Sequence, residues 1–195
     1  MSETSSIRRM LVTGTTGGIG GAVRDAARAR GWDVVELNRA DWEEGAFARP
    51  LAGPFDAVVF ATGTCPVRPL TAMKDGELEE TFAVNCGLFV KLMRRLVREK
   101  LNAPAGMKVV AVSSVSAVEG WAGGAAYCAS KGALSAVCRA LDAELKPRRI
   151  SVLAIEPRHV KTRMFDACAG RMGVDSKLAA SPESVAAEIL TCIMS

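Results

Sequence analysis

A glycine-rich segment near the start of the chain constrains its fold more than any other feature. The segment Thr13-Gly14-Thr15-Thr16-Gly17-Gly18-Ile19-Gly20 follows a short apolar run at residues 10–12 and precedes an amphipathic stretch at 19–30. Glycines let the backbone turn tightly and approach a phosphate, and the first N–H groups of a helix attract negative charge. A strand, glycine loop and helix in this order are typical of a dinucleotide-binding fold. A glycine-rich turn without a ligand is the simpler alternative.

Short apolar runs alternate with longer amphipathic stretches along the chain. This alternation is typical of a parallel sheet covered by helices on both faces. We therefore expect an α/β chain with one Rossmann-type domain over residues 1–195, a doubly wound parallel sheet in three αβα layers, and the strand order 3-2-1-4-5-6. The expected strands are 10–12, 33–37, 57–60, 108–112 and 150–155, and the expected helices are 19–30, 77–100, 124–145 and 182–194.

The composition limits the classes of function. At 195 residues, with 49% hydrophobic and 24% charged residues, the chain suits a single soluble domain with a full core. A net charge of +4 is too small for the basic stripe of a nucleic-acid-binding protein. No apolar run approaches the roughly 20 residues that span a bilayer. We expect no nucleic-acid partner and no membrane partner.

The cysteines and the single histidine argue against a metal site. The six cysteines, at positions 65, 86, 128, 138, 168 and 192, include no CxxC pair, and His159 is the one histidine. This pattern does not match a structural zinc site. Scattered cysteines suit a reducing compartment, and the polar start of the chain lacks the apolar core of a signal peptide. We expect no bound metal and a cytoplasmic protein.

The single tyrosine, Tyr127, stands four residues before Lys131 in the segment Tyr127-Cys128-Ala129-Ser130-Lys131. On a helix this spacing places both side chains on one face. A neighbouring ammonium group favours the phenolate and so lowers the pKa of the tyrosine, which would make it a proton donor and acceptor nearer neutral pH. The alternative is that Tyr127 is only a packed helix residue.

Together these motifs resemble the short-chain dehydrogenase/reductase family, and within it the 3-oxoacyl-carrier-protein reductases. The loop at residues 13–20 is similar to the family's TGxxxGxG pattern, and the segment from Tyr127 matches YxASK. Ser114 follows an expected strand and stands thirteen residues before the tyrosine, as in the family pattern. Asn85 lies in a segment similar to the one that holds the family's active-site asparagine. The resemblance extends from about residue 10 to 164.

The resemblance implies a reaction and four catalytic residues. Tyr127 would exchange a proton with the substrate oxygen while a nicotinamide cofactor transfers hydride. Lys131 would lower the pKa of the tyrosine and hold the nicotinamide ribose. Ser114 would bind the substrate oxygen, and Asn85 would support a water-linked proton relay to the lysine. The implied function is an oxidoreductase that interconverts a carbonyl and a secondary alcohol in a small-molecule substrate.

The resemblance also implies the cofactor and its contacts. After the second expected strand an acidic residue would select NAD, whereas a basic residue accommodates the extra phosphate of NADP. Asn38 and Arg39 stand there, so we expect NADP. NAD stays the alternative, because a two-residue slip would place Glu36 at the acidic position. The implied cofactor-binding residues are Gly14, Thr16, Gly18, Ile19, Gly20, Asn38, Arg39, Thr62, Gly63, Tyr127, Lys131, Pro157, Val160 and Thr162.

The chain departs from the family pattern in several places. The NNAG segment reads Phe60-Ala61-Thr62-Gly63, and the Pro-Gly pair reads Pro157-Arg158. Residues 38–56 are too few for a typical strand and crossover helix, so we expect an abbreviated third-strand region. The family's seventh strand is missing, which leaves 150–155 as a possible sheet edge. We expect residues 163–180 to form a short, mobile substrate loop.

Two alternative functions and a homodimer are also considered. A non-catalytic NADP-binding regulatory or redox-sensing protein is favoured by the trimmed C-terminus and the altered NNAG segment. A sugar-nucleotide epimerase is disfavoured, because such enzymes add a sizeable substrate domain. The resemblance implies a homodimer that pairs the helices at 77–100 and 124–145.

Overall fold

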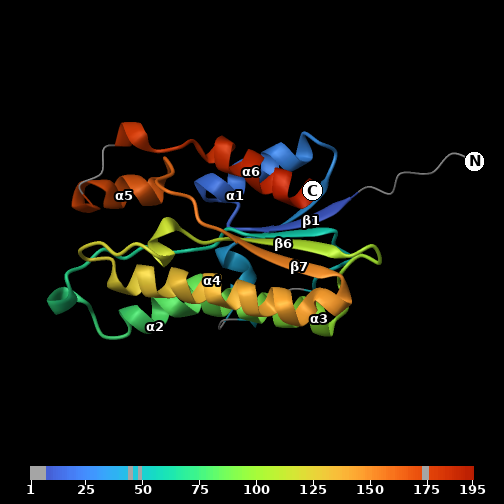
Figure 1. Ribbon diagram of the computed structural model, residues 1–195, viewed down its shortest axis with the longest axis horizontal. Helices are drawn as coiled ribbons and strands as arrows, with labels where there is room; N and C mark the ends of the chain where they lie inside the picture. Colours follow the sequence, from blue (N-terminus) through green and yellow to red (C-terminus); the bar gives the residue numbers. More distant parts are fainter. Residues whose placement is uncertain (1–7, 44–45, 48–49, 173–175) are drawn as a thin grey trace, which may run out of the picture.

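A parallel sheet lies between two layers of helices in the computed structural model, which describes residues 8–43, 46–47, 50–172 and 176–195 (Figure 1). Its strands run in the order β2-β1-β5-β6-β7. All neighbouring strands pair in parallel, so their carboxyl ends meet at one edge of the sheet. The strands are β1 (Arg9–Thr13), β2 (Asp33–Leu37), β5 (Ala57–Phe60), β6 (Met107–Val112) and β7 (Ile150–Ile155).

The helices cover both faces of the sheet. In Figure 1, α1 and α6 lie above it, α2, α3 and α4 lie below it, and α5 lies toward the end where β7 finishes. The helices are α1 (Gly18–Arg28), α2 (Glu77–Phe82), α3 (Leu88–Arg98), α4 (Ala125–Leu145), α5 (Arg163–Met172) and α6 (Pro182–Met194). Short 3₁₀ turns lie at Arg39–Asp41, Leu70–Ala72, Val115–Ala117, Lys146–Arg148 and Ser176–Leu178.

Two apolar cores hold the layers together. The core under α3 and α4 includes Phe60 and Phe89, whose ring centroids are 5.3 Å apart, together with Leu134. The core under α1 and α6 includes Val23 and Ile189, both fully buried. Removing these apolar side chains from water favours the packing of the helices on the sheet. The expected α/β doubly wound fold with helices on both faces is confirmed.

The region after β2 corrects the expected strand order. In the described part of the chain the sheet continues no further than β2 at this side, so the third strand of the order 3-2-1-4-5-6 is not in it. Instead β3 (Trp42–Glu43) pairs antiparallel with β4 (Ala46–Phe47) in a separate small sheet. The short connection expected at 38–56 thus leaves β2 at one edge, and β7 lies at the other edge, as expected.

Two helical expectations also change. The helix expected at 77–100 is interrupted, because residues Ala83–Gly87 form a π-helical segment between α2 and α3. The mobile loop expected at 163–180 is wrong over its first half, where α5 forms. Phe165 and Cys168 are buried on α5, and this packing supplies the stability that the Ala- and Gly-rich sequence did not indicate.

Candidate active site

A cavity of about 400 Å³ opens where the carboxyl ends of the strands meet. Residues that follow β1, β5, β6 and β7 all contribute to its lining, and this is where parallel α/β sheets bind ligands. Many of the residues predicted from the sequence come together here. Those that line the cavity are Thr16, Gly18, Ile19, Gly20, Thr62, Gly63, Ser114, Tyr127, Lys131, Pro157, Val160 and Thr162.

The glycine loop forms one wall of this cavity, and its backbone leaves no room for a Cβ atom at Gly14, Gly18 or Gly20. Gly14 has φ of +70°, a conformation that favours glycine. A Cβ atom on Gly20 would lie 2.3 Å from the carbonyl oxygen of Gly14, and one on Gly18 would lie 2.6 Å from Cγ2 of Thr162. The loop therefore exposes bare backbone beside the first turn of α1. This cradle fits the pyrophosphate of a dinucleotide.

The residues after β2 contact the same loop. The Asn38 side-chain oxygen accepts a hydrogen bond from the Thr16 backbone N–H at 3.2 Å. Glu36 lies within β2, paired with Val12 of β1, and Asn38 is the first residue after the strand. Arg39 is exposed at the start of the 3₁₀ turn. Asn38 and Arg39 do not line the cavity itself but lie at its glycine-loop end.

Glu36 carries a charge that neighbouring groups already compensate. Its carboxylate accepts hydrogen bonds from the Thr15 hydroxyl and, at 2.7 Å, from Arg28. Burial alone would raise the pKa of Glu36, but these hydrogen bonds and the Arg28 charge outweigh burial and lower the pKa. The Glu36 side chain is thus an ionised group committed to the protein, and not a free acid at the strand end.

Tyr127, Lys131 and Ser114 lie together at the other end of the cavity. Lys131 donates a hydrogen bond from Nζ to the Val112 carbonyl at 2.8 Å, and Nζ lies 5.8 Å from the centroid of the tyrosine ring. The Ser114 hydroxyl oxygen accepts the Ser116 backbone N–H at 3.1 Å. A hydroxyl that accepts this bond still has its own O–H to donate, and Ser114 forms a hydrogen bond with Tyr127. The structure thus brings these three side chains together in one cavity.

Burial is the largest cause of the pKa shifts of Tyr127 and Lys131. It raises the pKa of Tyr127, and the nearby thiol of Cys65 adds to the rise, while a hydrogen bond with Ser114 opposes it. Burial also lowers the pKa of Lys131 to about 8. We expected the ammonium group to lower the tyrosine pKa, and this expectation is wrong here, because desolvation of the phenolate is the larger effect.

Asn85 lies behind the cavity rather than on its surface. Its side-chain oxygen accepts the Thr64 backbone N–H at 2.7 Å, and its Nδ2 donates to the Thr64 carbonyl at 2.9 Å and to Ser130 Oγ at 2.9 Å. Ser130 Oγ in turn donates to the Tyr127 carbonyl at 2.8 Å. The π-helical segment thereby ties the loop after β5 to the first turns of α4, which carries Tyr127.

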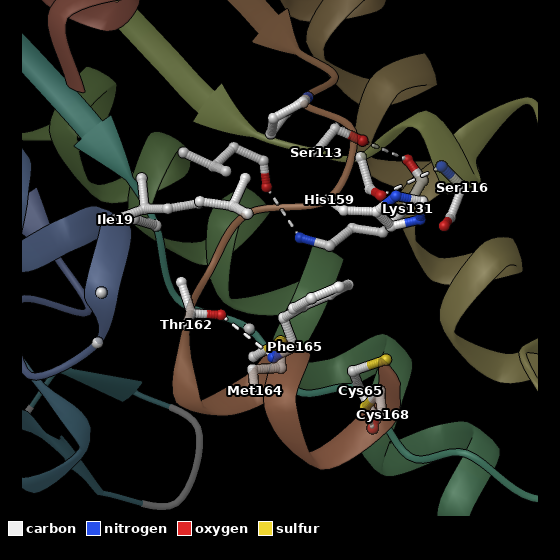
Figure 2. A pocket seen from close by; sticks show the side chains of 18 of the residues that line it. Ile19, Cys65, Ser113, Ser116, Lys131, His159, Thr162, Met164, Phe165 and Cys168 are labelled. Carbon is white, nitrogen blue, oxygen red and sulfur yellow. Dashed lines mark hydrogen bonds between the residues drawn. The ribbon is translucent and has the colours of Figure 1, made fainter. Parts of the chain in front are cut away.

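Several side chains that line the cavity were not among the site residues predicted from the sequence. Figure 2 shows Met164, Phe165 and Cys168 of α5 with Cys65 close by, on the far side of the cavity from Ile19. The Phe165 ring lies 5.5 Å from the ring of His159. The spacing of Met164, Phe165 and Cys168 is that of one helical face, so it was a usable signal. Trp121 and Cys65 line the cavity without any motif to mark them.

Two structural features do not occur among the described residues. No group of three or more metal-ligating side chains occurs among them. Their helices are too short or too polar to cross a bilayer.

Comparison with known proteins agrees with this geometry. The family model for short chain dehydrogenases matches residues 44–171. L-xylulose reductase of Bos taurus is 29% identical over 182 residues, which cover 82% of this chain and 75% of that protein. The 3-oxoacyl-acyl-carrier-protein reductase of Rickettsia conorii is 26% identical over 179 residues, covering 80% of this chain and 74% of that protein.

Solved structures share the fold. A 3-oxoacyl-acyl-carrier-protein reductase from Brucella melitensis in complex with NAD has a TM-score of 0.81 and 22% identity, covering 97% of this chain and 91% of that one. A short chain dehydrogenase from Burkholderia cenocepacia in complex with NADP has a TM-score of 0.77 and 23% identity, covering 95% of this chain and 90% of that one. Both NAD and NADP thus occur among structures with this fold.

Proposed function

We propose that this chain, which belongs to the short-chain dehydrogenase family, uses NADP to interconvert a carbonyl and a secondary alcohol, with Tyr127 as the proton donor and acceptor. Its family makes it an oxidoreductase that acts on a CH–OH group with NAD or NADP. The observation that carries the finer proposal is one cavity that joins the glycine loop to Tyr127, Ser114 and Lys131.

The glycine loop and the strand ends are the groups that would hold the cofactor. The backbone of residues 14–20 would bind the pyrophosphate, and Thr62, Gly63 and Val160 would line the path toward the nicotinamide. When bound, the nicotinamide supplies or accepts the hydride. Arg163 would border the cofactor site next to the glycine loop, because its Nη2 donates a hydrogen bond to the Thr16 carbonyl at 3.0 Å.

The roles of the catalytic residues follow from their hydrogen bonds. Ser114 would donate to the substrate oxygen, because it lines the cavity beside Tyr127 and has an O–H to donate. Tyr127 would donate its phenolic proton to the same oxygen during reduction. Burial raises the pKa of this phenol, so it holds a proton at neutral pH that it can donate. Asn85 would act as a positioning residue through Ser130 and the Tyr127 carbonyl.

The groups after β2 support NADP over NAD. Glu36, which would be the NAD-selecting acid only after a two-residue slip of the alignment, accepts hydrogen bonds from Thr15 and Arg28 instead. Arg39 is exposed beside Asn38, where its guanidinium can reach a phosphate on that ribose. A cation here stabilises the additional charge of NADP.

A homodimer is also proposed. The family pairs the helices that correspond to α3 and α4. On these helices the apolar side chains of Val90, Ala129, Ala136 and Ala140 are exposed. Their burial between two copies would be favourable. Light scattering at micromolar concentration should give the mass of a dimer, and a monomer would contradict the proposal.

The proposed reaction is tested by a screen of carbonyl compounds with the purified chain. Oxidation of NADPH, followed by the absorbance of the reduced cofactor, should depend on an added carbonyl and should be slower with NADH. Equal rates with the two cofactors would contradict the NADP assignment. NADPH binding without carbonyl-dependent oxidation across the screen would favour a non-catalytic role.

A further inference from the structure

The charged side chains that line the cavity are all basic. Lys131, Arg158 and Arg163 contribute cationic groups, and His159 contributes an imidazole. No aspartate or glutamate is among the described residues of the lining. A cavity with basic groups of this kind concentrates anions. The cofactor's phosphates account for part of this charge, so the position of each cation decides what it serves.

Two of the three cations are committed elsewhere. Arg163 reaches the glycine loop through its hydrogen bond to the Thr16 carbonyl, so it lies on the cofactor side. Lys131 is buried beneath the tyrosine and donates to the Val112 carbonyl. Arg158 is the cation that these contacts leave for a substrate.

Arg158 stands on the substrate side, next to the turn that carries Ser114. The preceding residue, Pro157, accepts the Val115 backbone N–H at 3.1 Å, which holds the two segments together. Tyr127 and Trp121 line the same cavity from α4 and from the loop before it. A substrate oxygen bound by Ser114 and Tyr127 would therefore leave the rest of the molecule close to Arg158.

The guanidinium of Arg158 can leave its present partner for another anion at little cost. Its Nη2 lies 3.3 Å from Oε1 of Glu119, and the two side chains are 73% and 53% exposed. Exposed ion pairs of this kind contribute little stability. Glu119 lies outside the cavity lining. An anionic substrate group could therefore replace Glu119 at small cost, and a guanidinium binds a carboxylate through two parallel hydrogen bonds.

We propose that Arg158 binds a carboxylate of the substrate, so that the enzyme acts on oxo acids in preference to neutral carbonyl compounds. This inference rests on the proposed carbonyl reduction and adds the class of substrate. Arg158 is a specificity residue in this account, because it contacts the part of the substrate that does not react. The family pattern has glycine at this position, so the site is a feature of this chain.

Matched pairs of acid and ester test the proposal. Acetoacetate and levulinate are compared with their methyl esters, with NADPH, for the wild type and for Arg158→Ala, Arg158→Lys and Arg148→Ala. Arg148 is an exposed arginine in the turn before β7, outside the cavity lining, so its variant carries the same change of net charge. The wild type should prefer at least one acid to its ester in kcat/KM.

Arg158→Ala should lower kcat/KM for the acids by about tenfold or more, the loss expected for a hydrogen bond between charged groups. The values for the esters should stay within about twofold, Arg158→Lys should recover part of the loss, and Arg148→Ala should change neither. A wild type that prefers the esters, or an equal loss for acid and ester, would overturn the carboxylate assignment while leaving carbonyl reduction intact.

If none of these acids and esters is reduced, turnover does not report on Arg158, and the site is judged by binding. Calorimetry then measures levulinate binding to the protein saturated with NADPH. Binding that is lost in Arg158→Ala but kept in Arg148→Ala supports the site. No binding to the wild type, or equal binding to both variants, overturns it.

Discussion

The two ends of the cavity are built differently. At the glycine-loop end the shape is set by the backbone of one segment, whereas at the Tyr127 end it is set by side chains from separate segments. The loop at residues 14–20 is closed so tightly that a Cβ on Gly20 would overlap the Gly14 carbonyl. The other side joins Tyr127 of α4, Phe165 of α5 and Cys65 of the loop after β5. The first wall is set by local backbone geometry, and the second by tertiary packing. Changes on the two sides should therefore separate cofactor binding from turnover.

The largest expected effect is on the Tyr127 side. Tyr127→Phe keeps the ring and its packing but removes the hydroxyl, so turnover should fall by about 10²–10⁴-fold. Binding of NADPH, measured by calorimetry, should stay the same, because the glycine loop is untouched. A variant that turns over a genuine substrate at the wild-type rate would show that Tyr127 is only a packed helix residue.

A methyl group added to the glycine loop should weaken cofactor binding, which Tyr127→Phe should leave unchanged. Gly20→Ala would place Cβ against backbone, and the shift needed to accommodate it costs about 1–3 kcal/mol. NADPH binding should weaken by about tenfold to a hundredfold. Gly120→Ala is the control, because a Cβ there meets nothing within 4 Å. If both variants bind NADPH like the wild type, the loop is not the phosphate site.

Arg39, next to the glycine loop, should affect the binding of one cofactor and not the other. Arg39→Ala should weaken NADPH binding by roughly tenfold, because it removes a charge-assisted contact to a phosphate. NADH binding should not change, since NADH lacks that phosphate. Equal weakening for both cofactors would mean that Arg39 supports the fold of the turn and does not select the cofactor.

The smallest expected effect concerns the stability contributed by Lys131. Its pKa is lowered from 10.5 to about 8, so between these values the unfolded chain binds more protons than the folded one. Stability must then rise with pH across this window. From pH 7 to pH 9 the wild type should gain about 1 kcal/mol relative to Lys131→Met. Denaturant titrations at both pH values measure this gain, and a constant difference would contradict the lowered pKa.

The same comparison explains what the sequence could predict. The glycine loop and the Tyr127–Lys131 pair are local in sequence, and periodicity located β2, β5, β7 and α6 at their observed bounds. The π-helical segment around Asn85 gave no signal, because it depends on hydrogen bonds to residues 64 and 130. The raised pKa of Tyr127 could not be predicted either, since it comes mainly from burial of the phenol by tertiary packing, to which Cys65 from a distant part of the chain adds.

The central claim is that the two sides of the cavity cooperate in carbonyl reduction. The most direct measurement uses NADPH deuterated at the transferred position, with acetoacetate, levulinate and their methyl esters as acceptors. Mass spectrometry of the alcohol product should show one deuterium on the former carbonyl carbon for the wild type, and almost no product for Tyr127→Phe. NADPH bound tightly by the wild type, with no labelled alcohol from any acceptor, would contradict the claim.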